Sequence, residues 1–462
     1  MFKIKTCIAF IFFMSCNNNH PENSRSVQLF TLDPGHFHAA LVQKTMYHDV
    51  DSTVHVYAPT GNDLRLHLDK INAYNKRGQN PTNWREEVYE GDDFFEKMIS
   101  EKKANPNNEG GHDDVVVLSG NNQKKAAYIL QSLQNGFNVL ADKPMAIDRK
   151  GFEELKQAFA AAAKNNLLLY DIMTERFEIT TIVMRELSMM PGIFGTLEKG
   201  TEENPAVVKE STHNFYKYVS GNVLTRPAWF FDVSKQGDGI TDVMTHLVDL
   251  VQWECFPGEA IDFTKDIQID AAKHWSTGLN LNKFKTLTLL DSFPSYLKNN
   301  ITNDTLLNVF SNGEINYTLR DVHAKTSVIW EYESAEGGDT YHSMMRGTKA
   351  SLEIKQGVEE KYKPTLYVKP VNDDPSYEKI LKEKIKELQN KFPGIDLKKS
   401  GQGWEVIIPE KYKEGHEAHF ARVTENFLSY LKNKNIPAWE VPCMLAKYYT
   451  TTSALDMALK NK

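Results

Sequence analysis

The sequence predicts an α/β protein in which an N-terminal, Rossmann-type doubly wound parallel sheet is followed by an α+β domain with a large mixed or antiparallel sheet. Two patterns carry this prediction. In the first third of the chain, short apolar runs alternate with helix-like segments, which is typical of βαβ units. From Gly192 onward, strand-like runs recur, among them residues 328–332 and 350–354. With 462 residues, 41% of them hydrophobic, the chain can form two or three domains.

The first elements follow from local sequence. Residues 27–32 predict a strand that turns at Asp33-Pro34-Gly35 into a helix through residues 39–42, and residues 53–57 predict a second strand. We expect the parallel-sheet domain to span residues 27–147. Its ligand crevice should lie at the carboxyl ends of the strands.

The remainder, residues 148–462, is expected to form the substrate and oligomerisation domain. Its charged stretch, residues 359–397, has i, i+4 charges typical of a solvated helix that interrupts the sheet. Residues 418–460 have helical periodicity and are expected to pack back on the first domain. Within the first domain, the polar segment 62–113 is interpreted either as a helical insertion near the crevice or as a surface elaboration without function.

The N-terminus is typical of an export signal. Basic residues 1–5 precede an apolar run, residues 6–14, that is too short to span a bilayer, and Cys16 follows. Residues 1–16 are therefore interpreted as a lipoprotein signal peptide and residues 17–26 as a linker. Lipidation of Cys16 would place the protein in the periplasm or at the outer membrane, held by its lipid anchor alone. An ordinary secretory signal is the alternative, and in either case the protein is expected to be exported.

Two cysteines remain after the signal peptide, Cys255 and Cys443. In an oxidising compartment they either pair or stay as buried free thiols. The net charge of −7 and the lack of long basic runs exclude a typical nucleic-acid-binding surface.

Two motifs point to chemistry. Asp242 and His246 stand four residues apart and lie on one face if their segment is helical. Such a pair suits general acid/base catalysis at one substrate hydroxyl. About a hundred residues upstream, an apolar run, residues 138–141, ends in Asp142-Lys143-Pro144.

In their order and spacing these motifs resemble the Gfo/Idh/MocA oxidoreductases. The resemblance covers roughly residues 27–350 and also rests on residues 114–122, on Glu175-Arg176-Phe177 and on Arg226-Pro227-Ala228-Trp229. It implies a lysine that reaches the nicotinamide from a strand end and an Asp-x-x-x-His pair that faces it. The family has Glu-Lys-Pro where this chain has Asp-Lys-Pro.

The resemblance implies three catalytic residues. Lys143, held extended by the following proline, would hydrogen-bond the reacting oxygen. His246 would exchange the hydroxyl proton, since its ordinary pKa lies near neutrality. Asp242 would orient the imidazole ring or contact the substrate. We expect no metal at the Asp242–His246 pair, because no third ligand stands at a recognisable spacing.

The cofactor expected from the resemblance is NAD or NADP, tightly bound if it is retained. The loop that should read Gly-x-Gly-x-x-Gly is Asp33-Pro34-Gly35-His36-Phe37-His38, with one glycine of three, so cofactor binding is weakened, rearranged or lost. The predicted cofactor-binding residues are Gly35, His36, Phe37, Asn121, Asn122, Lys143 and Pro144.

Arg176, Arg226 and Trp229 are the predicted substrate residues, with core packing as the alternative for the tryptophan. The expected partner is a small carbohydrate or cyclitol, and the second domain would supply a homo-oligomer face. We therefore expect an NAD(P)-dependent oxidoreductase acting on a sugar, sugar-derivative or cyclitol hydroxyl. Two alternatives remain open: a redox-neutral, NAD-dependent glycosidase that works through a keto-sugar, and a non-catalytic carbohydrate-binding protein that has lost its cofactor.

Overall fold

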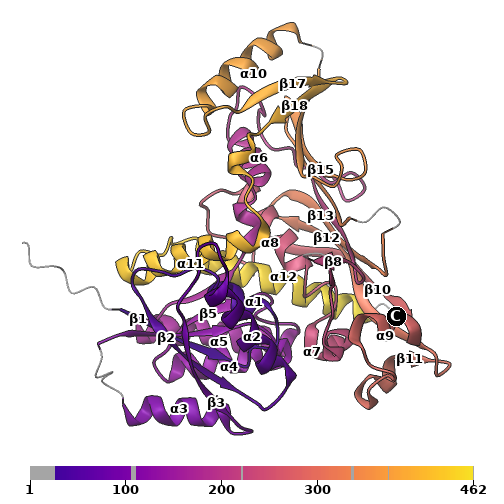
Figure 1. Ribbon diagram of the computed structural model, residues 1–462. Helices are drawn as coiled ribbons and strands as arrows, with labels where there is room; N and C mark the ends of the chain where they lie inside the picture. Colours follow the sequence, from indigo (N-terminus) through magenta and orange to yellow (C-terminus); the bar gives the residue numbers. More distant parts are fainter. Residues whose placement is uncertain (1–25, 106–110, 220–221, 335–337, 373, 461–462) are drawn as a thin grey trace, which may run out of the picture.

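The computed structural model describes residues 26–105, 111–219, 222–334, 338–372 and 374–460 (Figure 1). The expected signal peptide, residues 1–16, and Cys16 lie outside the described residues, as does the linker apart from Ser26. Within the described part of the chain, no helix is both long and apolar enough to cross a membrane.

The first domain is built on a six-stranded parallel sheet with strand order β3-β2-β1-β4-β5-β6. The central strands are apolar and buried on both faces, as parallel strands covered by helices must be. The predicted doubly wound sheet is confirmed. Its strands are β1 (Val27–Leu32), β2 (Val50–Ala58), β3 (Arg85–Glu90), β4 (Asp113–Leu118), β5 (Asn138–Asp142) and β6 (Leu169–Ile172).

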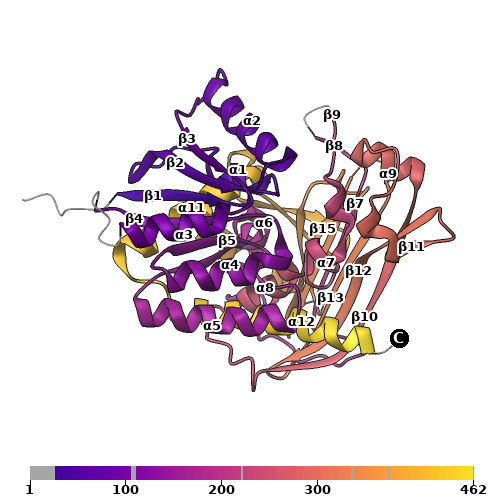
Figure 2. The same ribbon diagram turned by 90° about the horizontal axis from the view of Figure 1, so that it is seen from below.

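Helices cover both faces of this sheet (Figure 2). One face carries α1 (His38–Val42) and α2 (Asn62–Lys76). The other carries α3 (Phe94–Ala104), α4 (Asn122–Gln134) and α5 (Arg149–Asn165), and α5 begins where the Asp148 carboxylate accepts a hydrogen bond from the Gly151 N–H at 2.7 Å.

Two boundaries differ from the prediction. The parallel sheet does not end at residue 147, because β6 pairs with β5, so the first domain continues through Ile172. The segment 62–113 is not a purely helical insertion, since it supplies the edge strand β3 as well as α2 and α3. Strand β3 was missed because its sequence, Arg-Glu-Glu-Val-Tyr-Glu, is mostly polar and four of its six residues are exposed.

The second domain contains a ten-stranded mixed sheet in which β7 and β13 run parallel and the other neighbours run antiparallel. This confirms the predicted architecture. In spatial order the strands are β10 (Ile267–Asn280), β12 (Leu306–Leu319), β13 (Val322–Glu331), β7 (Val207–Asn214), β14 (Thr340–Arg346), β15 (Ala350–Gln356), β16 (Thr365–Pro370), β18 (Gly403–Ile407) and β17 (Asp396–Ser400), with β11 (Ile301–Thr302) beside β12.

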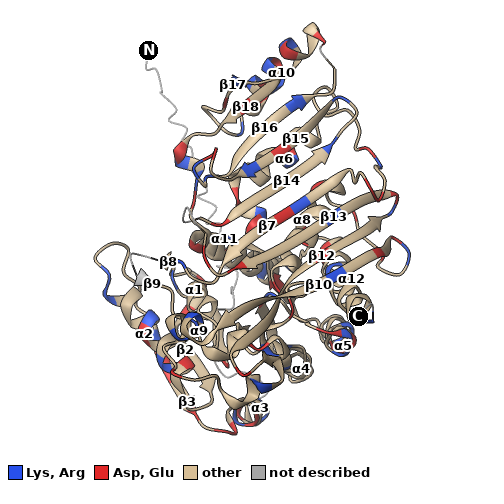
Figure 3. Cartoon of the chain, turned by 90° about the vertical axis from the view of Figure 1, so that its right-hand side faces the viewer, with Lys and Arg blue, Asp and Glu red and all other residues tan. Residues whose placement is uncertain are grey.

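One face of this sheet packs on helices, and the opposite face is turned to the viewer in Figure 3. Charges of both signs alternate across that face, and Lys325 bridges Glu210 and Glu314 at 3.2 and 3.1 Å. The remaining elements are η1 (Thr174–Phe177), α6 (Ile179–Ser188), the hairpin β8 (Tyr218–Val219) and β9 (Asn222–Val223), η2 (Ala228–Phe231), α7 (Val233–Gln236), α8 (Met244–Cys255), α9 (Leu281–Thr288) and η3 (Ser295–Asn300).

The charged stretch, residues 359–397, is only partly the solvated helix that we expected. It contains strand β16 as well as α10 (Pro375–Leu388). Helix α10 is amphipathic and buries one apolar face, on which the Tyr377 hydroxyl donates to the Ile193 carbonyl at 3.0 Å. The segment therefore extends the sheet rather than interrupting it.

The C-terminal residues return to the first domain, as predicted. After η4 (Glu410–Tyr412), α11 (His416–Asn433) and α12 (Glu440–Lys460) complete the chain. Phe420 and Tyr448 belong to the core of the first domain, whereas Leu455 belongs to the core of the second. Helix α12 (yellow in Figures 1 and 2) thus ties the two domains together. Cys255 and Cys443 are both free thiols.

Candidate active site between the two domains

Lys143 stands at the carboxyl end of β5 and reaches across to the second domain. Its ammonium group donates to Asp242 Oδ1 at 2.6 Å, and both side chains are about nine-tenths buried. The other carboxylate oxygen of Asp242 accepts from Gln236 Nε2 at 3.0 Å. The structure thus brings together two of the three predicted catalytic residues, from segments 99 residues apart.

Asp242 and His246 are not on one continuous helix. Asp242 lies in the turn before α8, and His246 lies in the first turn of that helix. The oxygens of Asp242 bond Lys143 and Gln236, and His246 Nδ1 is buried without a hydrogen-bond partner among the described residues. Asp242 therefore orients Lys143 rather than the imidazole.

Burial lowers the pKa of His246 well below its ordinary value, and the nearby positive charge of Lys143 lowers it further. The imidazole is neutral at physiological pH, which is the form that can accept a proton from a hydroxyl. An unpartnered ring nitrogen in a buried site is unusual, and a bound substrate would give it a partner.

The glycine loop lies against the end of β4. The Gly35 N–H donates to the Asp33 carbonyl at 2.8 Å, and the His36 N–H donates to the Ser119 carbonyl at 3.1 Å. Gly120 has a φ of +120°, and a Cβ there would stand 2.6 Å from the Gly35 nitrogen. Only glycine allows the two loops to approach this closely.

Two carboxyl groups line the same loop. Asp33 accepts from Asn121 Nδ2 at 2.8 Å, and Asp63 accepts from the Trp229 indole N–H at 2.9 Å. Burial raises the pKa of both carboxyl groups. The Trp229 ring packs over Gly35, and its contact with substrate stays a prediction.

These contacts decide how far the residues fit a nicotinamide dinucleotide. The residues fit the nicotinamide end of the cofactor. Lys143 follows β5, Asn122 follows the neighbouring strand β4, and they face Asp242 and Gln236 across the cleft. The diphosphate side departs from the usual glycine-rich pattern, because the Gly35 and His36 N–H groups bond within the protein and the carboxyl groups of Asp33 and Asp63 lie beside the loop.

Other predicted residues lie apart from this cluster. Phe37 is 40% exposed at the start of α1, under the ammonium group of Lys70. Pro144 is buried directly behind Lys143. Arg226 donates to the Phe215 and Asn214 carbonyls at 3.2 and 3.3 Å and lies over two aromatic rings.

Arg176 is locked in a buried ion network. Its guanidinium bonds Asp249 through two nitrogens at 2.6 and 2.7 Å and Glu440 through the third at 3.0 Å. Lys447 donates to the same Asp249 carboxylate at 2.9 Å. These contacts occupy the whole guanidinium group, so Arg176 joins η1, α8 and α12 instead of facing Lys143.

Sequence reasoning missed residues that the C-terminal helix brings to the cleft. The His416 ring, at the start of α11, lies 5.7 Å from the His38 ring, and its Nε2 lies 3.7 Å from a Glu175 carboxylate oxygen. Burial lowers the pKa of His416 to about 4 and raises the pKa of Glu175. The spacing His416-x-x-His419 was the available signal, but nothing in the sequence indicated that the partners of His416, His38 and Glu175, lie more than 200 residues upstream.

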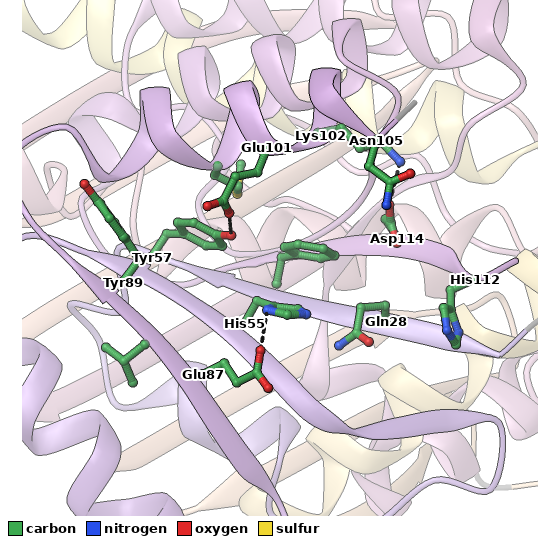
Figure 4. Close-up of a pocket in the computed structure, with 13 residues that line it drawn as sticks. Gln28, His55, Tyr57, Glu87, Tyr89, Glu101, Lys102, Asn105, His112 and Asp114 are labelled. Atoms are coloured by element: carbon green, nitrogen blue, oxygen red, sulfur yellow. Dashed lines mark hydrogen bonds and ion pairs between the residues drawn. The ribbon is translucent and has the colours of Figure 1, made fainter. Parts of the chain in front are cut away.

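A separate cavity lies in the first domain, and none of the predicted site residues lines it. It has a volume of about 590 Å³ and lies between α3 and strands β1 to β3 (Figure 4). Its walls combine aromatic and charged side chains, including Tyr57, whose hydroxyl donates to Glu101, and the pair His55–Glu87 at 3.5 Å.

Comparison with protein-family models agrees with both domains. Residues 81–171 match the model described as "Oxidoreductase family, NAD-binding Rossmann fold", and residues 183–459, more than half of the chain, match "Putative oxidoreductase C terminal domain". The chain belongs to the Gfo/Idh/MocA oxidoreductase family. As a member of this family it is an enzyme, an oxidoreductase with an NAD-binding Rossmann domain.

Solved structures of the Gfo/Idh/MocA type share the fold. A "putative oxidoreductase" from Parabacteroides merdae is 51% identical, with 95% of this chain and 98% of that chain aligned at a TM-score of 0.91. A levoglucosan dehydrogenase in complex with NADH and levoglucosan aligns over 95% and 98% of the chains at 11% identity and a TM-score of 0.58.

A third structure, the WlbA dehydrogenase from Bordetella pertussis in complex with NADH and UDP-GlcNAcA, aligns over 95% of this chain and 97% of that one. The identity is 13% and the TM-score 0.53. Identities this low establish the common fold alone. No curated protein matches the sequence.

Proposed function

We propose that this oxidoreductase acts on a hydroxyl, or the corresponding carbonyl, of a sugar, sugar derivative or cyclitol, and that Lys143, Asp242 and His246 carry the reaction. The observation behind the proposal is the contact between Lys143 and Asp242 across the domain boundary. It holds a buried ammonium group at the strand end where an α/β sheet binds its ligands.

Each residue has a role that follows from its surroundings. Lys143 donates a hydrogen bond to the reacting oxygen, and Asp242 together with Gln236 fixes the ammonium group in place. His246, neutral because it is buried, accepts the hydroxyl proton. A nicotinamide, when bound, supplies the hydride acceptor or donor.

The substrate class is supported by relatives with the same fold. One is a levoglucosan dehydrogenase crystallised with its sugar, and another was crystallised with a nucleotide sugar. In this chain, Glu175 and His416 add polar groups beside the cleft, as recognition of several sugar hydroxyls requires.

We further propose that the cofactor, NAD or NADP, stays bound through many turnovers. Three hydrogen bonds span the cleft: Lys143 to Asp242, Asn122 Nδ2 to the Gln236 carbonyl at 2.6 Å, and Trp229 to Asp63. Opening the cleft breaks all three, which slows exchange of the cofactor. A retained cofactor also suits an exported enzyme, because free nicotinamide nucleotide is scarce outside the cytoplasm.

Export itself is a proposal that rests on residues 1–16. We expect Cys16 to carry lipid. Growth with labelled palmitate should label the protein, the label should disappear in Cys16→Ala, and it should persist in the control Cys7→Ala. A protein that reaches the cell envelope without label carries an ordinary secretory signal instead.

The deciding experiment joins cofactor analysis to turnover. The purified protein is denatured and the supernatant is analysed for nicotinamide nucleotide by mass spectrometry; intact protein is then assayed with NAD or NADP against a panel of sugars, cyclitols and glycosides. Cofactor reduction with one sugar class, lost in Lys143→Ala and His246→Ala, supports the proposal.

Two other outcomes are informative. Cleavage of a glycoside without net cofactor reduction would identify the redox-neutral glycosidase. Sugar binding without turnover, by protein that takes up neither NAD nor NADP, would overturn the catalytic proposal in favour of a binding protein.

A further inference from the structure

Three metal-ligating side chains meet at the carboxyl edge of the first sheet. His36 stands in the loop after β1, His38 is the first residue of α1, and Asp142 ends β5. His38 Nδ1 lies 3.0 Å from Asp142 Oδ2, and His36 Nδ1 lies 3.9 Å from the same oxygen. One ligand atom from each residue lies within 4.8 Å of the other two.

These spacings suit one metal ion. Zinc binds imidazole nitrogen and carboxylate oxygen at about 2.0–2.2 Å, so the donor atoms around a tetrahedral centre lie about 3.3–3.6 Å apart. The two measured distances bracket this range. Two imidazoles and one carboxylate are also a ligand set that leaves positions open for water or substrate.

One of the three ligands, Asp142, is held by further hydrogen bonds. Ser119 Oγ donates to Asp142 Oδ2 at 2.9 Å, and Lys125 Nζ donates to the Asp142 backbone carbonyl at 2.8 Å. Outer-layer contacts of this kind fix the orientation of metal ligands. Among the described residues, His36 Nδ1 accepts one long hydrogen bond, 3.4 Å, from the His38 N–H.

A small cavity adjoins the cluster. It has a volume of about 10 Å³, and its lining includes His36, Asp142 and Lys143. This is close to the space needed for a single water molecule or ion and far below the volume of a sugar or a nicotinamide ring. The ammonium groups of Lys143 and Lys125 would oppose a cation here, but the first is paired with the Asp242 carboxylate and the second donates to the Asp142 backbone carbonyl.

We propose that His36, His38 and Asp142 bind one divalent transition-metal ion of the zinc class beside Lys143. The site replaces the glycine-rich turn of the family with a metal-bridged connection between the ends of β1 and β5. An open coordination position there would face the cleft and could polarise a water or substrate oxygen. The proposal does not depend on the substrate of the redox reaction.

Metal uptake tests the proposal without an activity assay. The purified full chain is stripped of metal with a chelator, titrated with ZnCl₂ by calorimetry, and analysed for bound metal after gel filtration. In a separate sample of the stripped protein, added Co²⁺ reports its coordination through visible absorption. We expect one equivalent per chain. His36→Ala and Asp142→Asn should each abolish that uptake, and Ser119→Ala should weaken it by about 10- to 100-fold.

Matched controls separate the site from other histidines. His48→Ala removes a side chain that is 99% exposed and should bind metal like the wild type. His416→Ala removes a neighbouring imidazole outside the trio and should retain one equivalent. Far-ultraviolet circular dichroism verifies that each variant is folded. Wild-type protein that takes up no metal, or a folded His36→Ala variant with wild-type affinity, would overturn the proposal and leave a hydrogen-bonded His38–Asp142 pair.

Discussion

Lys143 and Asp242 join the two domains directly, with the lysine Nζ 2.6 Å from the carboxylate Oδ1. The lysine comes from a strand end in the first domain and the aspartate from the turn before α8 in the second. Each is held on its own side: Lys143 by the buried Pro144, and Asp242 by Gln236. The relationship couples closure of the cleft to placement of the ammonium group.

Replacing Lys143 by alanine should lower kcat by about 10²- to 10⁴-fold, the usual cost of losing a positioned proton-transfer or hydrogen-bonding group. Stopped-flow measurement of cofactor reduction, with a sugar that the panel identifies, checks this expectation. Lys150→Ala, seven residues away and 84% exposed, is the matched control and should leave kcat unchanged. If Lys143→Ala changes KM alone, the lysine binds substrate without assisting the reaction.

Replacing Asp63 by asparagine should tighten binding of NADH by about fivefold or more. A unit charge about 4 Å from a phosphate costs about 1 kcal/mol even in water, and the amide oxygen of the introduced side chain would still accept the Trp229 N–H. Titration of NADH fluorescence measures the affinity. Asp69→Asn, on the exposed side of the same helix, is the control and should have no effect. An unchanged affinity in Asp63→Asn would place the diphosphate away from this loop.

Replacing Arg176 by methionine should destabilise the protein by about 3–5 kcal/mol, because Asp249 and Glu440 would be left as buried carboxylates with fewer partners. Urea unfolding measures the loss. Arg149→Met is a suitable control, since that side chain is 38% exposed and its ion-pair partner, Glu153, is 3.9 Å away and itself half-exposed. Wild-type stability combined with a raised KM for the sugar would instead restore the substrate role predicted from the sequence.

Strong local patterns were enough to predict the central elements of the first domain. The strands around residues 114–118 and 138–141 are buried on both faces and contain continuous apolar runs, whereas those around residues 27–32 and 53–57 are mostly buried and still rich in apolar residues. Edge strand β3 escaped detection because exposure permits polar residues. Strand β16 escaped because it is embedded in a charged segment whose helical part dominates the pattern.

The sequence could predict site residues that a short motif identifies, but not the contacts that form only when distant segments fold together. The motif around Lys143 identified a strand end, but only folding shows that Asp242 bonds that lysine and not His246. Arg176 and Trp229 were assigned to substrate by resemblance, whereas their partners, Glu440 and Asp63, lie far away in sequence. The His36–His38–Asp142 cluster likewise combines two segments that sequence spacing could not relate.

His67 should make stability depend on pH. It lies on α2, is 4% exposed, and neither ring nitrogen has a partner among the described residues. Burial lowers its pKa to about 4 from an ordinary value of 6.5. Between these pH values the unfolded chain binds a proton that the folded chain does not, so the stabilisation is complete above pH 6.5 and is lost as the pH falls towards 4.

The loss attributable to His67 should total about 3 kcal/mol, since each pKa unit corresponds to about 1.4 kcal/mol. Urea unfolding of the wild type and of His67→Leu, measured at intervals between pH 4 and 7, isolates this contribution from those of the other buried histidines. As the pH falls, the free energy of unfolding should decrease more for the wild type than for His67→Leu. That of His48→Ala should follow the wild type throughout. A constant difference across the range would mean that His67 titrates normally, and that α2 opens to admit water at its buried face.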